Sequence, residues 1–297
     1  MGVLLQGFFK LPPNRAVPSP ADSDQTNPWW WDHLATQADA LRRAGFTAVW
    51  IPPIVKTSAG VSGGADGYGP FDDYDIGSKR QMGTVPTGFG SREQLQRCVA
   101  TFRTNGIDVY IGMVEHYRIG DKQPVFRYLG ADGAVNIGRF PKNPLNFVSN
   151  VPRDPDPGGP PRDDFPFGRE LAPINAQPKN YVLNGLIDAA DWLTRALDVQ
   201  GYRLDDVKGL STNFLFPFLN SKSMQDKFSF GEYFDGSTTL VNGWVSNLHG
   251  MRGRASAFDL LLRFILQAMC NNAAASTWRM SPCYGAGEIW FRKNATV

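Results

Sequence analysis

Two acidic residues in the second half of the chain follow short apolar runs and could form a catalytic pair. Segment 201–205 (GYRLD) alternates in character, so Arg203 and Asp205 project to the same side of a strand. Glu232 ends a second apolar run, 228–231, and two aromatic residues follow it. If these runs are parallel strands, both carboxyl groups lie at the carboxyl edge of the sheet, where active sites of such folds are found.

Two carboxyl groups in different surroundings are what the hydrolysis of a glycosidic bond requires. A neighbouring arginine favours the ionised form of Asp205 and lowers its pKa, which suits a nucleophile. Aromatic neighbours favour the protonated form of Glu232, which suits a general acid. The alternative is that each acid only caps the helix that follows its strand, and the spacing favours neither interpretation.

The elements that would position this pair alternate between strand and helix. Apolar runs predict strands at 3–9, 46–51, 107–114, 201–204, 228–231 and near residue 257. Helical periodicity predicts helices from Asn27-Pro28 to Gly45 and at 91–104, 180–197, 213–219 and 261–269. This order predicts an α/β fold, a (β/α)8-type barrel that is incomplete, with about six strand–helix units.

The amino-acid composition of the chain changes between residues 118 and 178, where half of its 22 prolines lie. We predict a loop-rich lobe inserted after the third strand. The domain organisation is then a first part of the barrel at 1–117, the lobe at 118–178, and the continuation of the barrel at 179–297.

Composition narrows the classes of function. The chain has 297 residues, 42% of them hydrophobic and 20% charged, which is enough to build a packed core. A net charge of +2 gives nucleic acid little electrostatic reason to bind. No apolar stretch is long enough to cross a membrane, and the chain as given shows no leader, so we expect no membrane partner and take the cytoplasm as the default location. Cys98, Cys270 and Cys283 are too scattered for a disulfide framework.

Several segments resemble motifs of the α-amylase family, glycoside hydrolase family 13. Segment 201–208 (GYRLDDVK) resembles the G-x-R-x-D-x-x-K motif of that family, and Gly231-Glu232 resembles its general-acid segment. Segment 67–75 (GYGPFDDYD) resembles the loop whose tyrosine lines the sugar site. The lobe after the third strand corresponds in order to the family's domain B.

The resemblance implies a retaining glycoside hydrolase that acts on α-1,4-glucans such as starch and maltooligosaccharides. It implies Asp205 as the nucleophile, Glu232 as the general acid/base, and Arg203 as the partner that orients Asp205. Retention requires the two carboxyl groups to be about 5 to 5.5 Å apart. Tyr68 would be a stacking platform for the sugar, or else a core residue. Lys208 would contact a sugar on the leaving-group side, or else be a solvated lysine.

Segment 112–117 (GMVEHY) departs from the family pattern, D-V-V-x-N-H. Gly112 replaces the aspartate, and His116 replaces an asparagine that ligates calcium. Tyr117 replaces a histidine that holds the sugar, so we predict Tyr117 as a substrate-binding residue together with Tyr68 and Lys208. Calcium prefers oxygen ligands, so an imidazole should weaken or abolish that site. Of the other ligands that the resemblance implies, Glu170 would stand in for an aspartate and Gly209 would offer its carbonyl. We therefore predict no bound metal and no cofactor, with calcium an option only at altered ligand positions.

The family's last motif, F-V-x-N-H-D on the seventh strand, does not occur in the sequence. We therefore expect strands seven and eight and the C-terminal β domain to be absent, which leaves two unpaired sheet edges. Residues 273–297 would cover them, or self-association through the open edge of the barrel would, or else the fold is only marginally stable. Losing a transition-state contact costs about 100 to 1,000-fold in rate, so we expect weak or lost activity. The alternative is a catalytically inactive carbohydrate-binding or structural remnant of an amylase.

Overall fold

A sheet of six parallel strands forms the centre of the computed structural model, which describes residues 2–8, 29–61, 66–120, 126–130, 138–155, 168–248 and 255–271. In spatial order the strands are β1 (Leu4–Gln6), β2 (Ala48–Pro53), β5 (Asp108–Met113), β8 (Gly201–Leu204), β9 (Phe228–Gly231) and β10 (Ala255–Ala257). Neighbours in the sheet also follow one another along the chain. This is the strand order of a (β/α)8 barrel, of which six strands lie in the described part of the chain.

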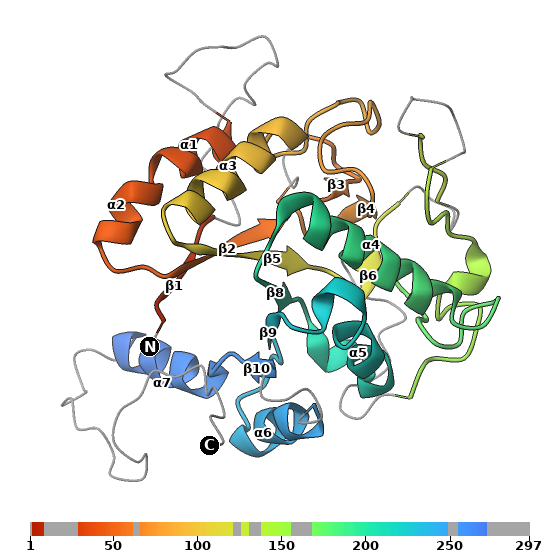
Figure 1. The fold of residues 1–297 in the computed structure, drawn as a ribbon. Coiled ribbons are helices and arrows are strands. Elements are labelled where there is room, and N and C mark those ends of the chain that lie inside the picture. The colour runs from red at the N-terminus through yellow and green to blue at the C-terminus, as the bar shows by residue number, and fades with distance from the viewer. Residues whose placement is uncertain are drawn as a thin grey trace.

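Helices surround the sheet (Figure 1). They are α1 (Trp30–Thr36), α2 (Ala38–Arg43), α3 (Arg92–Thr104), α4 (Tyr181–Leu197), α5 (Thr212–Leu219), α6 (Thr238–Asn247) and α7 (Leu260–Asn271). None of the helices in these ranges is long and apolar enough to cross a membrane. The incomplete α/β barrel predicted from the sequence is therefore confirmed.

Two details of the helices differ from the sequence predictions. The helix expected to end at Gly45 is two helices that meet at Gln37, and its expected cap, Asn27-Pro28, lies outside the described residues. Helix α6 was not predicted, because threonine, asparagine and glycine give it low helix propensity and Trp244 is its only buried residue.

The central strands of the sheet are buried, whereas the edge strand β1 is partly exposed. Every residue of β2 and β8 is buried, as expected for parallel strands covered on both faces. The buried residues of α4 recur at three- and four-residue spacing, and they include Val182, Leu186 and Leu193. Helix α3 begins at a capping box in which Ser91 and Gln94 satisfy each other's backbone amides.

Short antiparallel pairs extend from the carboxyl edge of the sheet. The loop after β2 holds β3 (Lys56–Thr57) and β4 (Pro70–Asp72), and the predicted lobe, residues 118–178, holds β7 (Arg169–Glu170), which pairs with β6 (Tyr117–Arg118). The amide of Ile119 donates to the carbonyl of Pro70 across 3.0 Å. The lobe therefore begins against the loop that follows β2.

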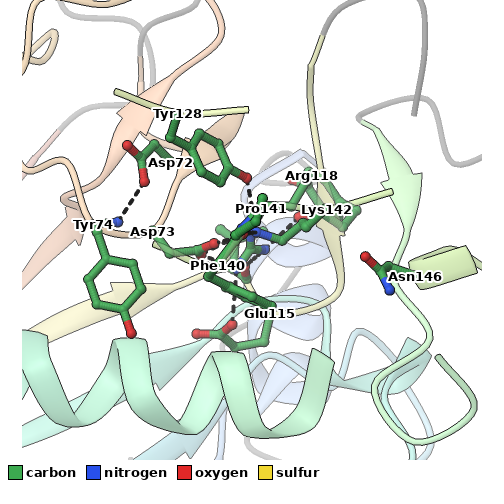
Figure 2. A network of polar contacts seen from close by, with 12 residues as sticks. Asp72, Asp73, Tyr74, Glu115, Arg118, Tyr128, Phe140, Pro141, Lys142 and Asn146 are labelled. Atoms are coloured by element: carbon green, nitrogen blue, oxygen red, sulfur yellow. Dashed lines mark hydrogen bonds and ion pairs between the residues drawn. The ribbon is translucent and has the colours of Figure 1, made fainter. Parts of the chain in front are cut away.

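Four buried charged residues, which we call the lobe anchor, join the lobe to the barrel: Asp73, Glu115, Arg118 and Lys142 (Figure 2). Asp73 follows β4 and accepts hydrogen bonds from Arg118 Nε at 3.0 Å and Lys142 Nζ at 2.8 Å. Arg118 Nη2 also contacts Glu115 Oε2 at 3.2 Å. The Lys142 ammonium donates to the Tyr128 hydroxyl at 3.0 Å. Three segments far apart in the sequence thus meet at one group of charges.

Burial and charge act in opposite directions on these acids. Burial raises the pKa of Asp73, but Arg118 and Lys142 outweigh it and hold the pKa below its usual range. Burial raises the pKa of Glu115 to about 7, because its one cationic contact only partly compensates. Asp73 is therefore the principal counter-charge for both buried cations.

We expect Asp73→Asn to lower the free energy of unfolding by about 3 to 5 kcal/mol, because it leaves Arg118 and Lys142 buried without their shared carboxylate. Urea denaturation of the two proteins measures this loss. The matched control is Asp39→Asn, which removes a surface partner of Arg43 whose side chain is 75% exposed and should cost less than about 1 kcal/mol. Equal losses in the two variants would contradict the role of the lobe anchor.

Candidate active site

The two predicted catalytic acids lie side by side at the carboxyl edge of the sheet. Leu204 of β8 pairs in register with Gly231 of β9, and Asp205 and Glu232 are the residues that follow them. The Glu232 amide donates to the Leu204 carbonyl at 3.0 Å, and the Asp205 amide donates to the Met113 carbonyl at 2.9 Å. Backbone hydrogen bonds to neighbouring strands therefore fix both residues.

Arg203 connects the two acids. Its Nη1 donates to Asp205 Oδ1 and its Nη2 donates to Glu232 Oε2. The guanidinium carbon lies 5.0 Å from the ring centroid of Trp50 and 5.6 Å from that of Tyr68, at distances typical of cation–π contacts. The side chain of Arg203 is 4% exposed, that of Asp205 10% and that of Glu232 29%. The sequence predicted the pairing of Arg203 with Asp205, but not its contact with Glu232.

The surroundings of Asp205 shift its pKa in the direction opposite to the one predicted from the sequence. Burial raises the pKa of Asp205 to about 6, Arg203 opposes this without outweighing it, and the charge of Glu232 raises it further. The expectation that arginine would leave Asp205 with a lowered pKa is therefore wrong, because it omitted burial. Two aromatic residues follow Glu232 in the sequence, and in the structure its carboxylate contacts the guanidinium of Arg203.

Tyr68 and Tyr117 lie together beside the pair. Tyr68 is half-buried in the loop between β3 and β4, and its ring is near Arg203. Tyr117 of β6 is buried, and its hydroxyl donates to the Tyr68 carbonyl at 2.8 Å. Burial raises the pKa of both phenols, so they are hydroxyl donors at neutral pH. Tyr117 thus fixes the backbone that presents the Tyr68 ring.

Lys208 connects the loops that follow β8 and β9. It lies in a short 3-10 helix (Val207–Gly209), and its ammonium contacts Asp235 Oδ2 at 2.7 Å. The nitrogen is also 5.8 Å from the ring centroid of Tyr233. Asp235 was not identified from the sequence, because an acid three positions after Glu232 has no distinguishing pattern. Its contact places Lys208 on the Glu232 side of the site.

The position that the resemblance assigned to a calcium ligand holds a buried imidazole. His116 Nδ1 is 3.1 Å from Asp206 Oδ2, and its Nε2 is 3.4 Å from Glu170 Oε1. Burial lowers the pKa of His116, but its hydrogen bonds to these two carboxylates outweigh burial and raise it overall. Calcium takes oxygen ligands and the nearest side chain here is an imidazole with nitrogen atoms only, so these residues do not fit that ion.

Comparisons with known proteins agree with the geometry. No family model matches the chain. Over 290 residues it is 26% identical to the glucan 1,4-alpha-maltohexaosidase of Bacillus sp. (strain 707), an alignment that covers 80% of this chain and 53% of that protein. Over 90 residues it is 38% identical to the alpha-amylase of Bacillus licheniformis, covering 30% of this chain and 17% of that one.

The fold is likewise similar to solved structures. An alpha-amylase from Malbranchea cinnamomea matches 86% of this chain and 49% of its own with a TM-score of 0.51 and 18% sequence identity. This likeness concerns the fold alone. The chain spans about half the length of the maltohexaosidase and of this amylase.

We expect the Asp205 carboxyl to titrate with a pKa of about 6, and Glu232→Gln to lower that pKa because it removes a nearby negative charge. Carbon-detected NMR of labelled aspartate measures both values, with Asp205→Asn identifying the signal. Asp32→Asn, which changes an acid on α1, is the matched control and should leave the titration unchanged. A wild-type pKa near the usual value of about 3.9 would contradict the burial of this group.

Proposed function

Because the chain belongs to the α-amylase family, glycoside hydrolase family 13, we propose that it hydrolyses α-1,4-glucans with retention of configuration. One guanidinium group supports this proposal: Arg203 contacts both Asp205 and Glu232, so the two carboxyl groups share one site. The names of the related maltohexaosidase and amylase support starch or maltooligosaccharides as the substrate class.

In the first step Asp205 attacks the anomeric carbon while Glu232 donates its proton to the glycosidic oxygen. The bond from that carbon to the leaving sugar breaks, and a covalent glycosyl ester forms at Asp205. In the second step Glu232 takes a proton from water, the water oxygen attacks the anomeric carbon, and the ester bond breaks. A pKa of about 6 leaves Asp205 ionised, and therefore nucleophilic, at neutral pH.

Arg203 would serve both steps from one position. Before attack it orients Asp205, the ionised member of the pair, while Glu232 holds the proton that it donates. When Asp205 becomes an uncharged ester, the guanidinium still faces Glu232. It would then pair with the carboxylate that Glu232 becomes after it has donated its proton.

The tyrosines and Lys208 would bind the sugar around this pair. We propose that the Tyr68 ring stacks on the sugar at the cleavage point and that Lys208, paired with Asp235, contacts the leaving side. The Tyr117 hydroxyl is engaged with the Tyr68 carbonyl, so Tyr117 would act through the position of Tyr68. Because the family has a histidine on the sugar at this position, we propose weak activity, lower by about 100 to 1,000-fold if that contact is lost.

We expect purified chain to release reducing sugar from soluble starch slowly, and Asp205→Asn to lower the rate by at least about 1,000-fold, because it removes the nucleophile. Asp39→Asn is the matched control, since it makes the same change on the surface of α2. Equal rates for wild type and Asp205→Asn would contradict the catalytic role. Calorimetry with maltoheptaose then identifies the alternative, because binding without turnover is what an inactive carbohydrate-binding remnant would show.

A further inference from the structure

His116 lies where the predicted lobe meets the barrel, and its ring lies between two carboxylates. Asp206 belongs to the loop after β8, one position beyond Asp205, whereas Glu170 belongs to β7 of the lobe. The ring is 1% exposed and has one nitrogen toward each acid, at 3.1 Å and 3.4 Å. The carbonyl of His116 also accepts the amide of Leu171 at 2.9 Å, so its backbone contacts the lobe as well.

A second cation completes this group, which we call the junction clasp: His116, Arg153, Glu170 and Asp206. Arg153 Nε donates to Glu170 Oε1 at 2.7 Å. In the clasp, two carboxylates therefore contact two nitrogen-bearing side chains, an imidazole and a guanidinium. Buried carboxylates need such partners, because an unpaired buried charge is strongly unfavourable.

The space between the carboxylates is filled by the imidazole. A Cβ atom built on Gly209 would lie 2.2 Å from His116 Cε1, so the ring packs directly on the Gly209 backbone. The cavity beside the ring has a volume of about 10 Å³, which is at the lower limit for one water molecule. Calcium needs about six to eight oxygen ligands at about 2.3 to 2.6 Å. Among the residues that the structure describes, the junction offers neither that space nor those ligands.

We propose that the His116 ring and the Arg153 guanidinium take the place of a metal ion at this junction, so that side-chain nitrogen atoms hold Glu170 to Asp206 and the folded chain requires no divalent cation. The wild-type chain should then be indifferent to both chelators and calcium. The inference rests on the geometry of the clasp and does not depend on the proposed catalytic activity.

Thermal unfolding followed by circular dichroism tests the proposal on the full chain, first exhaustively treated with EDTA and then in excess calcium chloride. We expect one midpoint in both conditions, and no stoichiometric calcium in elemental analysis of the purified protein. A wild-type midpoint that falls in EDTA and recovers with calcium would overturn the proposal. This measurement is decisive even if a clasp variant does not fold.

The variant His116→Asn removes the ring and supplies an amide oxygen. We expect its midpoint to fall by roughly 5 °C or more, since it leaves Asp206 and Glu170 without the ring nitrogens between them. Calcium should then raise the midpoint of this variant alone. The matched control is His33→Asn on α1, which should show neither effect. A His116→Asn variant as stable as His33→Asn would overturn the proposal.

Discussion

The contact of one buried guanidinium with two carboxylates is the interaction on which the rest of the site depends. Asp205 and Glu232 would repel each other without Arg203, and Arg203 would be an unpaired buried charge without them. The three groups therefore stabilise one another only if β8 and β9 keep their register, because a shift of one residue would turn their side chains to the other face. The rings of Trp50 and Tyr68 make cation–π contacts with the guanidinium.

The lobe is held by the same kind of interaction. Regular structure in the described residues of the lobe consists of short pieces such as β7, and apolar side chains such as Phe126 and Phe147 pack into the core beside the buried charges. The lobe anchor and the junction clasp both place lobe residues opposite barrel residues through buried charges. Buried ion pairs add little net stability but strongly penalise any arrangement that separates them. They are therefore suited to fixing the position of a loop-rich segment beside an active site.

The sequence predicts those parts of the site that depend on local pattern. Apolar runs ending in an acid place Asp205 and Glu232 at strand ends, and alternation places Arg203 beside Asp205. What depends on tertiary packing could not be predicted: the contact of Arg203 with Glu232, the effect of burial on the pKa of Asp205, and the pairing of Asp73 with Lys142, 69 positions away. The reason for a glycine at position 112 could not be predicted either. Only the structure shows that a Cβ atom there would lie 2.9 Å from Pro53.

Trapping of the covalent intermediate shows whether Asp205 is the nucleophile. The Glu232→Gln variant should still react with α-maltotriosyl fluoride, because fluoride leaves without a proton donor, but it lacks the base that activates water. The account predicts that intact-mass and peptide mass spectrometry find one maltotriosyl group per chain, attached at Asp205 and absent when Asp205 is replaced by asparagine. No adduct, or an adduct on another residue, would contradict a shared site in which Asp205 is the nucleophile.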